Sequence, residues 1–68
     1  MRQHDTVTLP ALLLAIQASG LSVRRVCRAA GVNPSVVSRW KSGKVEPRLS
    51  SLRRVAAALA RLQAEEGV

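Results

Sequence analysis

The sequence holds almost no aromatic residues and very few of the residues that build disulfides, metal sites or active sites. Trp40 is the only aromatic residue, Cys27 the only cysteine and His4 the only histidine. One cysteine excludes an intramolecular disulfide, and one cysteine with one histidine is too small a set for zinc. Proteins that bind single-stranded nucleic acid stack bases on several aromatic side chains, so this composition also disfavours that class.

Acidic residues are equally scarce, and their spacing offers no acid-base pair: Asp5, Glu46, Glu65 and Glu66 are the only four. Cys27 falls at an apolar helix position with no histidine placed to activate it, so we interpret it as a buried small residue. His4 lies in segment 1–7, which we expect to be frayed. The sequence therefore predicts no catalytic residue, no metal and no cofactor, and the chain is not expected to be an enzyme.

Basic residues dominate the charge. Eleven Lys and Arg stand against four Asp and Glu, which gives a net charge of +7 and a pI near 11.7. Such a balance indicates a polyanionic partner, with nucleic acid favoured and an anionic membrane surface as the alternative.

Length limits the organisation of the chain. Its 68 residues correspond to one domain, 1–68, with a thin core that a second copy would help to stabilise. Residues 1–20 loosely imitate a secretory signal, but Pro10 interrupts the apolar stretch and Asp5 lies in its basic region, so a first core helix is the favoured interpretation. No run approaches the roughly 18 apolar residues of a membrane span, and we expect a cytoplasmic, soluble protein.

Helical periodicity and glycine punctuation predict four helices, over about 9–18, 23–30, 34–42 and 49–65. Thr8, Ser22 and Asn33 are the expected N-caps, and Pro34 opens the third helix. The last helix should place Leu49, Leu52, Val55, Ala56, Leu59 and Leu62 in the core, and Arg54, Arg61, Ala57 and Ala58 opposite. The fold class is all-α, a four-helix domain with a fifth helix as the alternative.

Residues 23–43, VRRVCRAAGVNPSVVSRWKSG, have the spacing of a helix-turn-helix. Cys27 supplies a small residue at the helix crossing, and Gly31 can take the positive φ that the turn needs. The apolar residues that hold the second helix across the first are Val26, Ala30, Val32, Val37 and Trp40.

Residues 8–62 resemble the lambda-repressor-like, Xre/Cro type of helix-turn-helix regulator. The resemblance rests on the motif, on the leading helix LPALLLAIQASGLS and on the segment GKVEPRLSSLRRVAAAL. The resemblance implies a sequence-specific regulator of bacterial or phage type that binds double-stranded DNA, with helix 34–42 in the major groove. Repression is its expected mode of action.

The resemblance also implies which residues contact DNA. Asn33, Ser35 and Arg39 match the positions that face the major groove, and Arg39 is the strongest base reader because its guanidinium can bind guanine through two hydrogen bonds. Ser38 and Val36 complete the base-reading candidates, although Val36 packing against the loop before the last helix is an equal alternative. The phosphate-contacting candidates are Ser22, Arg24, Lys41, Ser42, Lys44 and Arg48, whereas we expect Arg25 and Arg28 to be solvated.

Three positions depart from the family pattern: Val23 replaces a glutamine, Lys41 replaces a glutamate, and Arg48 replaces a Ser or Thr cap. Many members use a fifth helix to dimerise, and we do not expect that route here. A homodimer on a two-fold symmetric operator is still expected, because one copy makes few base contacts. Candidate partner surfaces are the strip Leu14, Ala11 and Ala18, for which an ordinary exposed leucine is an equal alternative, and the outer face of the last helix around Ala57 and Ala58, where helix propensity of alanine is the favoured interpretation. The alternative function is an antitoxin-like protein-interaction module that uses its helix-turn-helix secondarily.

Overall fold

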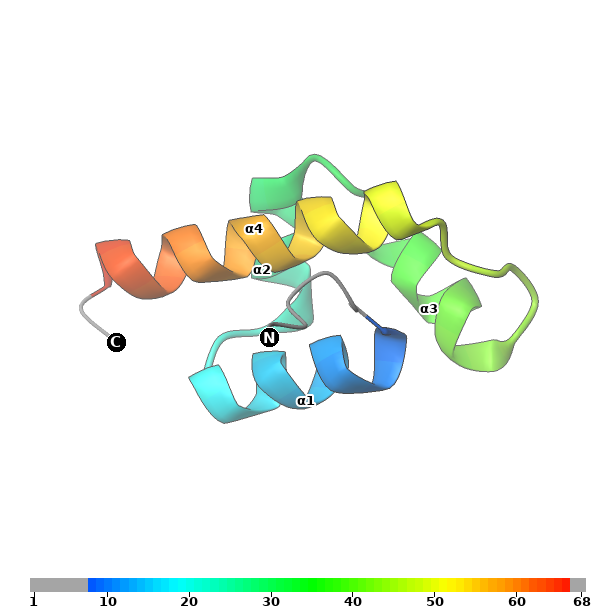
Figure 1. Ribbon diagram of the computed structural model, residues 1–68, viewed down its shortest axis with the longest axis horizontal. Helices are drawn as coiled ribbons and strands as arrows, with labels where there is room; N and C mark the ends of the chain where they lie inside the picture. The colour runs from blue at the N-terminus through cyan, green and yellow to red at the C-terminus, as the bar shows by residue number, and fades with distance from the viewer. Residues whose placement is uncertain (1–7, 67–68) are drawn as a thin grey trace, which may run out of the picture.

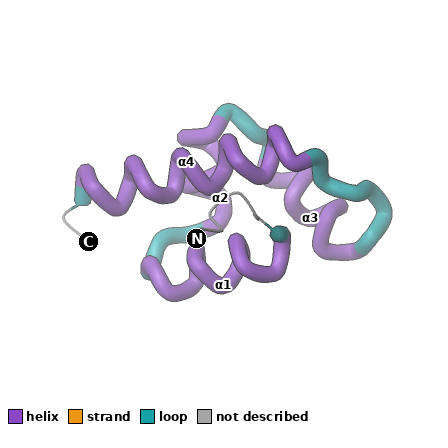
Figure 2. Tube along the Cα trace, viewed as in Figure 1, coloured by secondary structure: helices purple, strands orange, loops and turns teal. Residues whose placement is uncertain are grey.

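Four helices joined by short loops make up the part of the chain that the computed structural model describes, residues 8–66 (Figures 1 and 2). They are α1 (Leu9–Ser19), α2 (Val23–Ala30), α3 (Pro34–Ser42) and α4 (Leu49–Glu65). Residues 8–66 contain no strand, and the predicted all-α class is confirmed. The predicted helix bounds are correct except that α1 continues one residue further, to Ser19. The expected fraying of 1–7 concerns residues outside the described range.

The helix ends follow from their capping residues. Side-chain oxygens of Thr8, Ser22 and Asn33 accept hydrogen bonds from backbone N–H groups in the first turns of α1, α2 and α3. These bonds satisfy donors that a helix start leaves without partners. Arg48 makes no such bond at the start of α4, as its residue type predicts. The first three helices each end at a glycine with positive φ, Gly20, Gly31 and Gly43.

The longest helix, α4, organises the core because it lies against both α1 and α2, while α3 packs on α2 (Figure 1). The buried side chains come from all four helices: Leu12, Ile16, Val26, Cys27, Val37, Trp40, Leu52, Val55, Ala58, Leu59 and Leu62. Half-buried residues around this set, such as Leu9 and Leu13 of α1, extend the core toward the surface.

Two predictions for α4 are wrong. Leu49, predicted for the core, is 46% exposed, and Ala58, predicted for the outer face, is only 1% exposed. The buried arc of α4 is therefore turned by part of a turn toward the side that carries Ala58. The physical reason is that α4 packs against α2 as well as α1. The outer-face partner surface loses Ala58 as a consequence, whereas Ala57 is exposed.

The C-terminal end of α2 has a hydrogen-bond donor for each of its last four carbonyls. Within the turn, Val32 N–H donates to the Cys27 carbonyl (2.9 Å) and Gly31 N–H to the Arg28 carbonyl (3.2 Å). The other two donors come from α4: Arg61 Nη2 reaches the Ala29 carbonyl and Arg54 Nη2 the Ala30 carbonyl, each at 3.2 Å. Cations are favourable at a helix C-terminus because the carbonyl dipoles point toward them.

Ala58 makes this junction possible. Arg54, Ala58 and Arg61 are spaced i, i+4, i+7, so they share one side of α4. A buried alanine between two arginines gives α2 a place for close approach, and the arginines reach its end from either side. Sequence reasoning put Arg54 and Arg61 on the face away from the core. They are exposed, but each also holds α2.

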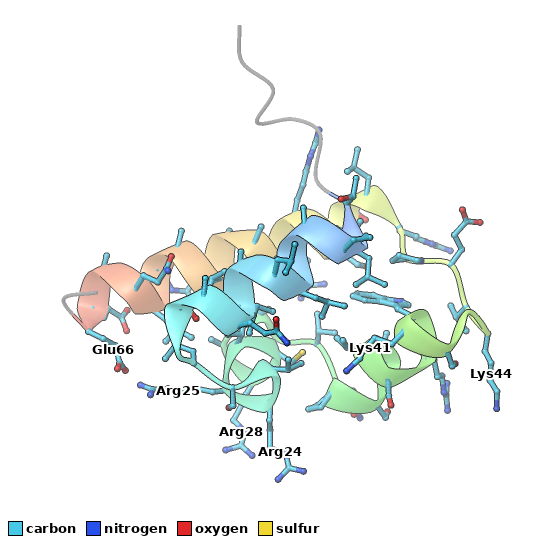
Figure 3. All side chains as sticks on the ribbon, turned by 90° about the horizontal axis from the view of Figure 1, so that it is seen from below. Arg24, Arg25, Arg28, Lys41, Lys44 and Glu66 are labelled. Atoms are coloured by element: carbon cyan, nitrogen blue, oxygen red, sulfur yellow. The ribbon has the colours of Figure 1, made fainter. Side chains whose placement is uncertain are left out.

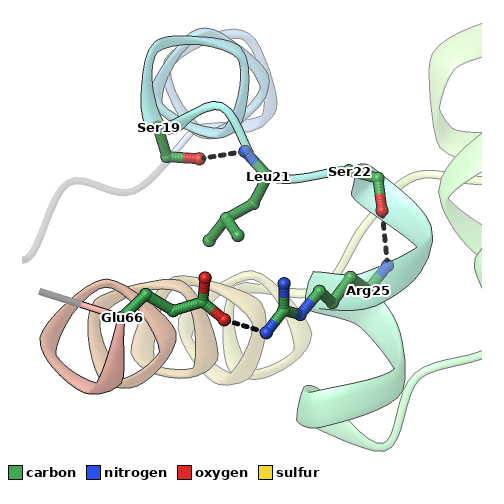
Figure 4. Close-up of polar contacts among 5 residues, drawn as sticks. All are labelled: Ser19, Leu21, Ser22, Arg25 and Glu66. Atoms are coloured by element: carbon green, nitrogen blue, oxygen red, sulfur yellow. Dashed lines mark hydrogen bonds and ion pairs between the residues drawn. The ribbon is translucent and has the colours of Figure 1, made fainter. Parts of the chain in front are cut away.

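The residue that follows α4, Glu66, connects the C-terminal end of this helix to the first turn of α2. Arg25, expected to be solvated, forms an ion pair with Glu66, while its own backbone N–H donates to the Ser22 hydroxyl at 3.1 Å (Figure 4). In the connection before α2, Leu21 N–H donates to Ser19 Oγ at 3.1 Å. The side chains of Arg25 and Glu66 are 53% and 31% exposed, so we assign the pair a small contribution to stability.

None of the helices found between residues 8 and 66 combines the length and the apolar character that a membrane crossing requires.

The junction predicts different effects for two adjacent arginines of α4. Arg54→Ala should lower the free energy of unfolding by about 1 kcal/mol, because the Ala30 carbonyl loses a charged donor. Arg53→Ala is the control, since Arg53 makes no hydrogen bond or ion pair with any residue in 8–66. It should change the free energy by less than about 0.5 kcal/mol. Urea unfolding followed by Trp40 fluorescence measures both, and equal effects would contradict the capping role.

Candidate nucleic-acid interface

The helix-turn-helix is assembled from α2, the turn 31–33 and α3. Val26 and Cys27 are fully buried where α2 meets its neighbours, and Val37 and Trp40 anchor α3 from the opposite side of the turn. Ala30 and Val32 are half-buried against the same core, and Gly31 has φ +75°. All seven residues predicted for the motif core thus lie in or against the core or at the turn.

One face of α3 is polar and exposed. Ser35, Ser38, Arg39 and Ser42 are all exposed. At about 100° per residue they occupy roughly a 100° arc, opposite the buried Val37. An exposed polar arc on a helix held by its apolar side is the geometry with which a recognition helix enters the major groove.

Internal hydrogen bonds limit what Asn33, Ser35 and Ser42 can offer to DNA. Asn33 Oδ1 accepts from Ser35 N–H (3.0 Å) and from the Ser35 hydroxyl (2.9 Å), and the Ser42 hydroxyl donates to the Arg39 carbonyl at 3.0 Å. Ser35 and Ser42 therefore keep acceptor capacity but have already used their protons. Asn33 keeps its side-chain amide donors. Ser42 in this conformation has no proton for a phosphate oxygen, which is an acceptor.

Val36 lies beside the polar arc rather than in it. It is half-buried and packs against the core, so the alternative of a packing role fits its position better than base reading does. Arg39 is the opposite case. It is exposed, and its guanidinium makes no ion pair or hydrogen bond within residues 8–66, so the guanidinium is available to a ligand.

The six phosphate-contacting candidates are all exposed, but they do not form one patch. Arg24 projects from α2, and Lys44 from the loop after α3, at opposite ends of the motif (Figure 3). Lys41 lies two residues, and so about 200°, from Arg39 around α3, and the two cannot enter one groove together. Ser22 and Arg48 precede α2 and α4.

The start of α2 offers backbone donors. Arg25 N–H bonds the Ser22 hydroxyl and Val26 N–H bonds the Ser22 carbonyl at 3.1 Å. The N–H groups of Val23 and Arg24 have no acceptor among residues 8–66. Free N–H groups at a helix start are favourable for a phosphate.

The motif is also strongly basic. Six cationic residues and no carboxylate occur between residues 23 and 44, namely Arg24, Arg25, Arg28, Arg39, Lys41 and Lys44. Of these, Arg25 has its charge offset by Glu66. The surface around the turn therefore has a positive potential, which attracts a polyanion and depends on salt.

Cys27 shows no sign of a reactive thiol. It is fully buried, and burial raises the pKa of the Cys27 thiol above its ordinary value. A raised pKa keeps the thiolate, the reactive form, rare at neutral pH. Within residues 8–66 no three His, Cys, Asp or Glu side chains lie together as a metal site would need. His4 is outside the described residues.

The outer face of α1 is apolar and uncharged. Leu14 is 65% exposed, and Ala11, Ala15 and Ala18, which share its side of the helix, are exposed as well. No charged residue occurs anywhere in α1. The predicted strip Leu14, Ala11 and Ala18 thus exists as one surface, with Ala15 added to it.

Arg28, expected to be solvated, is exposed, but sequence reasoning did not foresee that it lies beside the turn. Together with Arg24, Gly31, Val32, Asn33 and Pro34 it lines an open hollow of about 400 Å³ at the turn. The i, i+4 spacing of Arg24 and Arg28 was the available signal, because it places both side chains on one side of α2. That the turn lies beside them could be seen only in the folded chain.

A recognition helix with an exposed polar arc, held across a second helix by a glycine turn, defines the protein as a helix-turn-helix protein. The HTH_3 helix-turn-helix family model matches residues 12–64. The chain belongs to this family of the Xre and lambda-repressor type, a family of DNA-binding regulators, as its sequence motifs predicted. No curated protein and no solved structure matches the chain.

The turn glycine is predicted to be more sensitive to substitution than the other helix-ending glycines. Alanine at Gly43, which has φ +82° and open space around it, should cost about 1 to 2 kcal/mol of strain. Alanine at Gly31 carries the same strain, and its Cβ would also lie 3.1 Å from Arg54 Nη2. It should therefore displace Arg54 from the Ala30 carbonyl, at a further cost of about 1 kcal/mol.

A double-mutant cycle measures that coupling. The extra loss of unfolding free energy in Gly31→Ala should vanish when Arg54 is already alanine. An excess that persists in the Arg54→Ala background would show that strain at Gly31 has another origin.

Proposed function

We propose that this chain is a sequence-specific regulator of transcription, of bacterial or phage type, that binds double-stranded DNA with α3 in the major groove. The observation that carries the proposal is the exposed polar arc of α3, Ser35, Ser38, Arg39 and Ser42, on a helix anchored from behind by Val37 and Trp40. Repression is the proposed mode, because a small domain on an operator excludes other proteins from the same DNA.

Arg39 is the proposed base reader. Arg39 lies at one edge of the polar arc, one turn after Ser35, and its exposed guanidinium is not engaged by any carboxylate in residues 8–66. A guanidinium fork matches O6 and N7 of guanine. Ser35 lies beside Arg39 on the arc, and Ser38 lies at the arc's opposite edge. The free lone pairs of Ser35 fit a base amino group, such as that of adenine or cytosine, because its proton is used within the turn.

Backbone contacts fix the register of α3. The free N–H groups of Val23 and Arg24, together with the Ser22 hydroxyl, are proposed to bind one phosphate at the start of α2. Lys44 and Arg48, in and after the loop that follows α3, are proposed to bind the backbone on the other side of the groove. Such contacts add affinity for any sequence.

A homodimer on a two-fold symmetric operator is proposed on electrostatic grounds. Two copies that each have a net charge of +7 repel one another over most of their surfaces. The outer face of α1 is the exception, because it is apolar, uncharged and made of small residues around Leu14. We therefore propose that a second copy packs there, with Leu14 among the alanines of its partner.

The alternative is an antitoxin-like module in which a different protein occupies the α1 face. Both proposals use the same exposed Leu14, and the mass of the purified complex separates them. A stoichiometric second chain favours the module, and a dimer of this chain favours the regulator.

Selection from random duplex DNA at physiological salt tests the DNA-reading role of Arg39. The wild type should enrich a two-fold symmetric motif that contains guanine. Arg39→Ala should lose preference for that guanine, with affinity for the motif reduced by about 1 to 3 kcal/mol, or roughly 5- to 150-fold. Arg53→Ala removes the same charge from α4 and should leave the motif unchanged. Weak binding without a motif, in the wild type as in the variant, would contradict sequence-specific recognition.

The α1 face gives a second prediction. Leu14→Glu should lower binding to a duplex with two half-sites by about tenfold or more, because a carboxylate would be buried without a partner. Binding to one half-site should change far less. Gln17→Glu, on the same helix but outside the apolar strip, introduces the same charge and is the control. A monomeric mass for the wild type on saturated DNA would contradict the dimer.

A further inference from the structure

The open hollow at the turn of the helix-turn-helix is bounded by two arginines on one side and by the turn on the other. Arg24 and Arg28 come from α2, Gly31 to Pro34 form the opposite wall, and the volume of the hollow is about 400 Å³. Figure 3 shows Arg24 and Arg28 projecting together from α2, away from the other helices.

Within residues 8–66, no carboxylate balances the charges at the hollow. Like charges at i, i+4 on a helix repel each other, and residues 23–44 contain no carboxylate. Arg25 shows the contrast, because it has Glu66 as a partner. Neither Arg24 nor Arg28 has an ion pair or a side-chain hydrogen bond within residues 8–66. An anion between the two guanidinium groups would remove this repulsion.

The turn adds neutral hydrogen-bond donors at the same place. Asn33 Oδ1 faces the first turn of α3, where it accepts hydrogen bonds from the backbone N–H and the hydroxyl of Ser35. Its side-chain NH2 and its backbone N–H have no acceptor within residues 8–66. Pro34 has no N–H, so the donors at the hollow are those of the two arginines and Asn33.

We propose that Arg24, Arg28 and Asn33 bind one phosphodiester of the DNA backbone, at the edge of the groove that α3 enters. This inference rests on the proposed function and deepens it, because it gives Arg28 a role and makes Asn33 a phosphate-binding residue rather than a base reader. Planar guanidinium forks match the paired oxygens of a phosphodiester. In a helix-turn-helix the first helix of the motif crosses the backbone, which is where these arginines lie.

The openness of the hollow identifies the source of the phosphate. A free phosphate ion would stay largely hydrated in a site this open and would have only three residues to hold it. A phosphodiester of a bound duplex is brought to the hollow by the other contacts of α3 and α2. The site therefore adds affinity and register to a complex that already forms.

The first experiment measures how affinity depends on salt for the duplex selected by the wild type. Arg28→Gln should reduce affinity about fivefold at physiological salt and lower the slope of log affinity against log salt by about one. Its selected motif should not change. Arg53→Gln removes one charge from α4 and should change affinity less than twofold. Arg28→Lys, which keeps the charge and loses the fork, should fall between Arg28→Gln and the wild type, and far-ultraviolet circular dichroism verifies that each variant is folded.

The second experiment locates the contact. Single methylphosphonate substitutions along the selected duplex neutralise one phosphate at a time. At one position on each half-site, the substitution should weaken wild-type binding several-fold and weaken Arg28→Gln clearly less, since that variant has already lost one of the two arginines that bind this phosphate. If Arg28→Gln responds as the wild type does at every position, the inference is wrong.

These outcomes separate the inference from the proposed function. If the wild type selects a motif but Arg28→Gln has the same affinity and salt slope as Arg53→Gln, the phosphate site is wrong and the proposed regulator stands. If the wild type selects no motif, the proposed regulator is wrong. The salt slopes of the wild type and of Arg28→Gln on mixed-sequence duplex DNA then show whether the phosphate site exists. Unchanged DNA binding by Arg28→Gln, together with loss of a co-purifying acidic protein, would assign the hollow to a protein partner.

Discussion

The end of α2 is the constraint on which the rest of the structure depends. Its last carbonyls must find donors, and the donors come from the Gly31 turn and from Arg54 and Arg61 of α4. The turn sets the direction in which α3 leaves α2, while the arginines fix α2 on α4. The buried Ala58 permits that approach. The orientation of the recognition helix is thus decided by α4, which does not itself belong to the helix-turn-helix.

The charged residues are distributed unevenly over this small domain: the helix-turn-helix is basic and α1 is uncharged. The helix-turn-helix carries its cations without a single carboxylate between residues 23 and 44, and α1 carries no charge. Glu66 offsets Arg25 at the edge of this region. One surface is therefore suited to a polyanion and another to an apolar contact, so that DNA and a second copy need not compete for the same residues.

Much of the fold was predictable because local signals agreed with one another. Thr8, Ser22 and Asn33 cap helices, Gly31 ends one, and the apolar spacing puts Val26, Val37 and Trp40 inside. The errors lie where one helix meets two neighbours. Leu49 fits the apolar period of α4 but is exposed, and Ala58 fits a solvent face but is buried, because periodicity locates an apolar face and does not reveal a second helix packed beside it.

The same distinction applies to the candidate site. The sequence by itself determined the class of fold, the helix-turn-helix and the exposed polar residues of α3, because these depend on contacts a few residues apart. Only the tertiary structure decided that Arg54 and Arg61 cap α2, that Arg25 pairs with Glu66, and that Arg28 faces the turn across a hollow. The first two bring together residues 24 to 41 positions apart in sequence, and the hollow depends on how α2 is set against the turn. No local pattern encodes such contacts, because the direction of a long side chain is settled by which helix packs against its own.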